Sequence, residues 1–126
     1  MWSHNSSPVK FFMKKKIGKI GEKIASNYLK KAGYKIICQN YQKRFGEVDI
    51  IAEKNNEIIF VEVRSKEKND FSPILTITKR KIEKLKNLAL NYLSENGIMD
   101  KQIRFDIIGL VKKNGKFLIE HIKNAF

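Results

Sequence analysis

The sequence is poor in residues that cross-link a chain or anchor it in a membrane. It has one cysteine, Cys38, so an internal disulfide is excluded, and with only His4 and His121 it cannot complete a four-ligand zinc site. The longest apolar stretch, residues 107–111, is far shorter than the ~18 residues that a membrane span needs. No apolar block follows the lysines near the N-terminus, so no secretory signal is expected. We therefore expect a soluble, cytoplasmic protein.

Acidic residues are also scarce, because 13 of them face 26 lysines and arginines and leave a formal net charge of +13. Such an excess favours a polyanionic partner, nucleic acid first and an anionic membrane surface second. The competing interpretation is a lysine-rich proteome, which the high asparagine and isoleucine content also favours. With 126 residues and an apolar share of 42%, the chain can bury a core and fits one domain.

Hydrophobic periodicity predicts a single α/β domain with a central mixed sheet flanked by helices. Helical period covers residues 17–32 and about 78–95, and strands are expected at residues 34–38, 47–53, 57–64, 103–111 and 116–122. The Asn114-Gly115 dipeptide favours a tight hairpin turn between the last two strands. We expect residues 65–73 to form a loop. Residues 1–12 are expected to be a disordered or non-native extension ahead of a domain spanning residues 13–126.

Two acids lie inside apolar strand segments. Asp49 shares a strand face with Glu47 and Ile51, and Glu62 shares one with Arg64. An ionised carboxylate in a strand covered on both faces costs several kcal/mol unless a cation or hydrogen-bond donors compensate. Two such acids on adjacent strands of a hairpin can converge on one cation. The alternative is a pair of edge-exposed acids that pair with Arg64 and nearby lysines.

Helical geometry places two further charged side chains beside the apolar faces of the helices. Glu22 lies at the border of the first helix's apolar arc, so it either reaches over the sheet or is solvated. Lys81 lies between the directions of Leu85 and Leu88, inside the second helix's arc. It either extends outward to solvent or meets an anion near the sheet.

Several short motifs follow one another along nearly the whole domain. They are Gly21-Glu22, Gly33-Tyr34, Asn40-Tyr41, Gly46-Glu47-Val48-Asp49-Ile50-Ile51, Phe60-Val61-Glu62-Val63-Arg64 and Arg104-Phe105-Asp106. Together they resemble the YraN family of small bacterial proteins, and GEVDII followed by FVEV at this spacing is a specific pair. That family is assigned to the restriction-endonuclease-like PD-(D/E)XK fold, with a site layout similar to archaeal Holliday-junction resolvases. The resemblance therefore implies this fold.

The resemblance also implies roles for individual residues. Asp49 corresponds to the motif's metal-binding aspartate and Glu62 to its second carboxylate, which together would bind Mg²⁺ or Mn²⁺. Glu22 corresponds to the helical glutamate of the resolvase branch, and Lys81 to a basic position at the start of the following helix. With Arg64 these residues form the expected catalytic set.

Arg64 is where the sequence departs from the family, which usually has lysine two residues after the glutamate. Arginine keeps the charge and can contact a phosphate at two points, but its pKa above ~12 prevents it from acting as a base. Lys66 cannot replace that lysine, because it lies ~6–7 Å further along the strand. Binding should therefore survive this substitution better than catalysis.

Three functions are compatible with the sequence. The first is a metal-dependent nuclease that acts on branched or otherwise structured DNA, as a homodimer by analogy with resolvases, without a membrane partner. The second is a nucleic-acid-binding module that keeps the fold without hydrolysis, which Arg64 favours. The third is a basic scaffold for an acidic protein or membrane, which leaves Asp49 and Glu62 unexplained. The expected phosphate-binding side chains are Lys14, Lys15, Lys16, Lys43, Arg44, Lys79 and Arg80.

Overall fold

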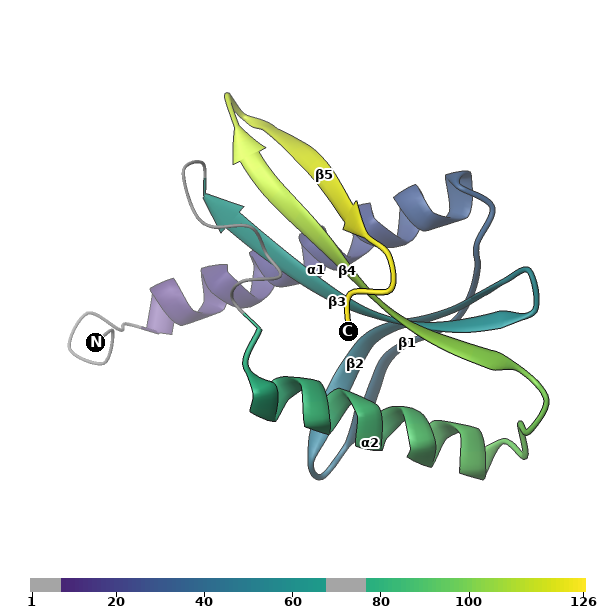
Figure 1. The fold of residues 1–126 in the computed structure, drawn as a ribbon. Coiled ribbons are helices and arrows are strands. Elements are labelled where there is room, and N and C mark those ends of the chain that lie inside the picture. Colours follow the sequence, from purple (N-terminus) through teal and green to yellow (C-terminus); the bar gives the residue numbers. More distant parts are fainter. Residues whose placement is uncertain (1–7, 68–76) are drawn as a thin grey trace.

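The computed structural model describes the backbone of residues 8–67 and 77–126, and the side chains of residues 18–65 and 77–126. These residues form two helices and five strands. The elements are α1 (Pro8–Lys31), β1 (Lys35–Lys43), β2 (Gly46–Lys54), β3 (Glu57–Glu67), α2 (Lys79–Glu95), β4 (Gln102–Lys113) and β5 (Lys116–Ile122). The strands form one sheet in the order β1-β2-β3-β4-β5, with α1 and α2 on opposite faces (Figure 1).

The connections explain why the sheet is mixed. Two-residue turns at Asn55-Asn56 and Asn114-Gly115, all four residues with positive φ, join antiparallel neighbours as tight hairpin turns do. Strands β3 and β4 are parallel because α2 lies between them in the chain and carries it back along the sheet. The prediction of one α/β domain with a central mixed sheet flanked by helices is confirmed. The architecture is consistent with a restriction-endonuclease-like fold.

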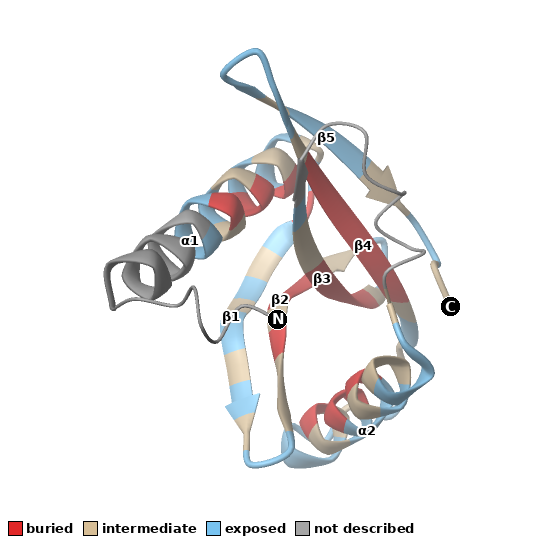
Figure 2. Cartoon of the chain, turned by 90° about the vertical axis from the view of Figure 1, so that its left-hand side faces the viewer, coloured by how far each residue is buried: buried red, intermediate tan, exposed pale blue. Residues whose placement is uncertain are grey.

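Each face of the sheet has its own hydrophobic core (Figure 2). Under α1, Ala25 and Leu29 are fully buried against residues such as Ile50 and Val61. Under α2, the buried cluster contains Val48, Ile51, Ile58, Phe60, Leu85, Leu88, Ala89, Tyr92 and Phe105. The three inner strands, β2, β3 and β4, therefore contribute to both cores and are covered on both sides, which makes any carboxylate within them costly.

Helix α1 differs from its expected position and orientation. It begins at Pro8, so residues 8–12 of the expected extension are helical, whereas residues 1–7 lie outside the described residues. The helical period over residues 17–32 places Ile20 on the apolar face, but this side chain is 45% exposed. The buried face instead includes Gly21, where a Cβ would lie 3.0 Å from Leu110 Cδ1. The absence of a side chain at Gly21 lets α1 approach the sheet closely, and this brings the adjacent Glu22 to it.

The sheet strands extend beyond several expected ends. Strand β1 continues to Lys43, five residues past its expected end, and β3 continues to Glu67, into the expected loop. Residues 68–73 of that loop lie outside the described residues. Strand β5 has its expected bounds.

The motif Arg104-Phe105-Asp106 has a structural role. Asp106 is fully buried and accepts hydrogen bonds from Arg104 Nε at 2.9 Å and from the Asn124 backbone N–H at 3.0 Å; His121 Nε2 lies 2.7 Å from its other oxygen. Burial raises the pKa of Asp106, but hydrogen bonds from His121 and Arg104 outweigh it and hold the pKa below its ordinary value. The motif thus ties the C-terminal segment to β4.

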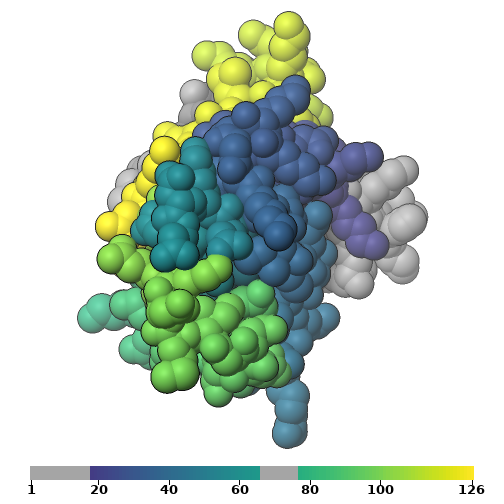
Figure 3. Space-filling model, turned by 90° about the vertical axis from the view of Figure 1, so that its right-hand side faces the viewer, coloured from purple at the N-terminus to yellow at the C-terminus, as the bar shows by residue number. Residues whose placement is uncertain are grey.

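One end of the molecule brings together segments that are distant in the sequence (Figure 3). The end of α1, the β2–β3 turn and the α2–β4 connection are adjacent there, and Lys54 Nζ donates to the Ala32 carbonyl at 2.7 Å. Lys101 pairs with Glu53 across the same region. Within the described residues, neither helix has the length and apolarity required to cross a membrane.

Candidate metal centre

The centre lies where β2 separates from β3. The paired residues of these strands run from Lys54–Glu57 to Ile50–Val61 and go no further. At the next position, Asp49 Oδ2 accepts a hydrogen bond from the backbone N–H of Val63 at 2.8 Å. The Asp49 carboxylate thus takes the place of a backbone acceptor and is held in the gap between the two strands.

Glu62 reaches the same gap from β3 and is only 6% exposed. Its Oε2 accepts a hydrogen bond from Arg64 Nη1 at 3.0 Å and lies 3.8 Å from Lys81 Nζ. Its Oε1 is buried and has no hydrogen-bond partner among the residues that the structure describes. A buried carboxylate oxygen without a donor is costly, so Oε1 is a candidate ligand atom for a cation.

The α2 N-terminus positions Lys81 for this contact. Thr78 is the N-cap residue, and its hydroxyl accepts a hydrogen bond from the Lys81 backbone N–H at 3.1 Å. The cap fixes the first turn of α2 above the sheet. Of the two interpretations of Lys81, an anion near the sheet is therefore the correct one, and that anion is Glu62.

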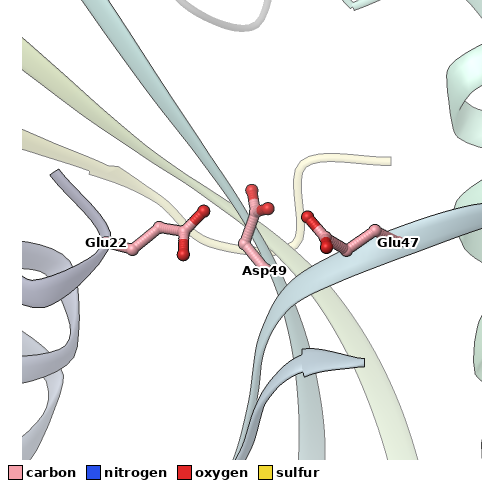
Figure 4. A group of neighbouring side chains, drawn as sticks. All are labelled: Glu22, Glu47 and Asp49. Carbon is pink, nitrogen blue, oxygen red and sulfur yellow. The ribbon is translucent and has the colours of Figure 1, made fainter. Parts of the chain in front are cut away.

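Three carboxylates meet beside Glu62. Oxygens of Glu22, Glu47 and Asp49 all lie within 4.8 Å of one another. Figure 4 shows Glu22 extending from α1 toward Asp49, which lies between it and Glu47 of β2. Glu22 therefore reaches the sheet and is not simply solvated, because the close approach at Gly21 carries α1 to this end of β2.

The negative charges of this cluster act on one another. Burial, followed by the charge of Glu62, raises the pKa of Asp49 to about 8, although the Val63 N–H bond acts in the opposite direction. Burial and the charge of Glu47 likewise raise the pKa of Glu22. Carboxylates this close strongly disfavour joint ionisation, and a bound cation would reverse that effect.

The residues present fit a hard divalent cation. The ligand atoms that these residues offer to a metal are all carboxylate oxygens, which suit Mg²⁺ and Mn²⁺ and not a thiolate-binding metal. Asp49 and Glu62 come from neighbouring strands, and Glu62 Oε1 offers a buried oxygen without a partner. These two residues are the pair that the strand pattern predicted to converge.

All five expected catalytic residues are brought together: Glu22, Asp49, Glu62, Arg64 and Lys81. Among the expected phosphate-binding residues, Lys79 and Arg80 are exposed on the first turn of α2, and Arg44 is exposed in the β1–β2 turn. Lys43 instead pairs with Glu95 at 2.7 Å. The side chains of Lys14, Lys15 and Lys16 lie outside the described residues.

Sequence reasoning missed two members of the centre. Glu47 shares a strand face with Asp49, and that spacing was a signal that could have found it. Asn40 has a φ of 55°, in the left-handed region, and its side chain acts to lower the pKa of Glu22, against the effect of burial. Strand periodicity gives no signal for such a residue, because alternation indicates which face a side chain occupies and not whether the backbone is left-handed.

The comparison with known protein families gives a match over most of the chain. Residues 21–110 match the family described as "Uncharacterised protein family UPF0102". The chain belongs to this family. The resemblance to the YraN family, which is UPF0102, is thereby confirmed, and the matched segment contains every residue of the candidate metal centre.

Relatives in UPF0102 match nearly the full chain. A "UPF0102 protein" of Syntrophomonas wolfei subsp. wolfei is 41% identical over 115 residues, covering 90% of this chain and 100% of the relative. A "UPF0102 protein" of Persephonella marina is 47% identical over 110 residues, covering 86% of this chain and 91% of the relative. Membership in UPF0102 extends across the domain as a whole.

Proposed function

We propose that this protein binds Mg²⁺ or Mn²⁺ at Asp49 and Glu62 and hydrolyses phosphodiester bonds in structured, branched DNA. The observation that carries the proposal is Glu62 Oε1, a buried carboxylate oxygen without a partner among the described residues, next to Asp49. A structural ion pair would satisfy both oxygens. A cation site leaves one oxygen for the metal.

The cation would supply the chemistry that carboxylates cannot, by polarising a phosphoryl oxygen and acidifying a water molecule. Arg64 and Lys81, which both contact Glu62 Oε2, are placed to neutralise the charge that develops on the phosphate. Asp49 is held in position by the Val63 N–H.

The basic surface beside the centre supports a polyanionic substrate. Lys79 and Arg80 are exposed on the same first turn of α2 that carries Lys81. Arg44 is exposed in the β1–β2 turn, near the start of β2. With a net charge of +13 over the chain, these side chains would hold the backbone phosphates while Asp49 and Glu62 meet the scissile bond.

A nucleic-acid-binding module without hydrolysis is the second candidate, and Arg64 is the observation that favours it. Its guanidinium is bound to Glu62 at 3.0 Å, and an arginine cannot accept a proton from an attacking water. In this case the fold and the phosphate contacts would remain, with little or no cleavage.

One assay separates the candidates. Purified protein is incubated with Mn²⁺ and a panel of linear, flapped and four-way DNA, beside Asp49→Ala and the charge-matched control Glu120→Ala on exposed β5. Cleavage that requires Mn²⁺ and Asp49, but not Glu120, supports the nuclease. Salt-sensitive binding without cleavage supports the binding module. If the protein shows no binding and no cleavage, both candidates are contradicted.

A further inference from the structure

We infer that Glu47 is a metal ligand, and that Glu22, Glu47 and Asp49 form a second divalent-cation position. This position would share Asp49 with the cation proposed at Glu62, so the inference rests on the proposed function. Glu47 has no counterpart in the motif roles carried over from the family resemblance. Its assignment comes from the geometry of the cluster and from the buried Glu62 carboxylate beside it.

The spacing of the three carboxylates suits one ion. Oxygens of Glu22, Glu47 and Asp49 lie within 4.8 Å of one another, and Figure 4 shows that Asp49 lies between the other two. Two oxygens on opposite sides of a Mg²⁺ ion lie about 4.2 Å apart, because each Mg–O distance is about 2.1 Å. The distances between the carboxylate oxygens would therefore have to shorten by only a fraction of an ångström to bind the ion.

Glu62 provides an independent indication of a cation position in this region. It is more than nine-tenths buried, Arg64 and Lys81 contact its Oε2, and its Oε1 has no partner among the described residues. Its charge acts on both Asp49 and Glu22, which places it against the cluster. Because Oε2 is engaged, Oε1 is the oxygen left for an ion that Asp49 can also reach.

One ion is not placed to contact all four carboxylates, because Glu62 is not among the three whose oxygens all lie within 4.8 Å of one another. An ionised carboxylate has two acceptor oxygens, so Asp49 can bridge one ion shared with Glu62 and another shared with Glu22 and Glu47. With all four ionised, Arg64 and Lys81 compensate two charges and one divalent ion compensates the other two. A second ion gives the centre a net positive charge, which is what binding a phosphodiester requires.

Counting bound Mn²⁺ by electron paramagnetic resonance tests the inference without reference to activity. We expect two ions per wild-type chain at saturation, one in Glu47→Gln and one in Glu22→Gln, with two retained in the control Glu120→Gln. Glu62→Gln should lose the other ion and keep the one at Glu47. Melting curves in EDTA check that each variant is folded.

The outcomes distinguish this inference from the proposed function. One ion in the wild type, or two ions in Glu47→Gln, would overturn the second position and leave the proposed site at Asp49 and Glu62 intact. No bound ion in the wild type would overturn both. Loss of one ion in both Glu47→Gln and Glu22→Gln, with two retained in Glu120→Gln, would establish it.

Discussion

The carboxylate of Asp49 accepts a hydrogen bond from the backbone N–H of Val63 at 2.8 Å, at the position where β2 stops pairing with β3. This bond has one role in the fold and another in the candidate site. It satisfies a strand N–H that the diverging β2 backbone no longer reaches, and it fixes one carboxylate next to Glu62.

The metal-free protein should lose stability as the pH rises from about 4 to about 8. Because the pKa of Asp49 is about 8 in the folded chain and near 4 when unfolded, the folded state keeps a proton in this window that the unfolded state releases. This lowers the free energy of unfolding by up to about 1.4 kcal/mol per pH unit. Asp49→Asn should remove that part of the slope, measured by urea unfolding in EDTA at several pH values. Equal slopes for the two proteins would show that Asp49 does not titrate in this way.

Divalent cations should raise the melting temperature. An ion that binds only the folded state stabilises it by about 2.7 kcal/mol at 100 times its dissociation constant, which is several degrees for a domain of this size. Asp49→Ala and Glu62→Ala should abolish the shift in millimolar Mn²⁺ or Mg²⁺, whereas Glu120→Ala should keep it. Differential scanning fluorimetry measures all four proteins. A wild-type melting temperature that does not change in either ion would argue for a purely structural cluster.

Arg64→Lys should increase metal-dependent cleavage while DNA affinity changes by no more than a few-fold. Arg64 binds Glu62 Oε2 at 3.0 Å, so a lysine there remains beside the same carboxylate and can exchange a proton as arginine cannot. Lys81→Ala should lower any residual cleavage, because it removes the other cation at Glu62. Single-turnover rates and binding curves decide the matter. If Arg64→Lys cleaves no faster, arginine is not what limits the chemistry.

DNA affinity should fall steeply with salt, and the basic turn of α2 should account for part of the slope. Replacing Lys79 and Arg80 with alanine should reduce the slope by up to about two counterions, since each phosphate contact contributes ~0.9. The matched control replaces Lys30 and Lys31, exposed at the far end of α1 and about 12–14 Å along the helix from Glu22. Affinities are measured by fluorescence anisotropy between 50 and 200 mM salt, a range of about fourfold. Equal effects of the two double variants would indicate only nonspecific charge.

Local patterns in the sequence determined most of the fold. The α2 helix and strand β5 have their expected extents because an amphipathic period and an Asn-Gly turn act over a few residues. The convergence of Asp49 with Glu62 was also predictable, since strand alternation and the hairpin between them fix which side chains share a face.

The remainder of the centre was decided only by tertiary packing. Whether Glu22 points to solvent or to the sheet depends on how closely α1 packs on the sheet. The close contact is between Gly21 and Leu110, which are almost ninety residues apart in the sequence. Glu47 lies close to Glu22 because the first residues of β2, before Ile50, pair with β1 and not with β3. Periodicity reports which face a residue occupies. It carries no information about where a strand bends or how near a helix lies, because both depend on contacts between segments distant in the chain.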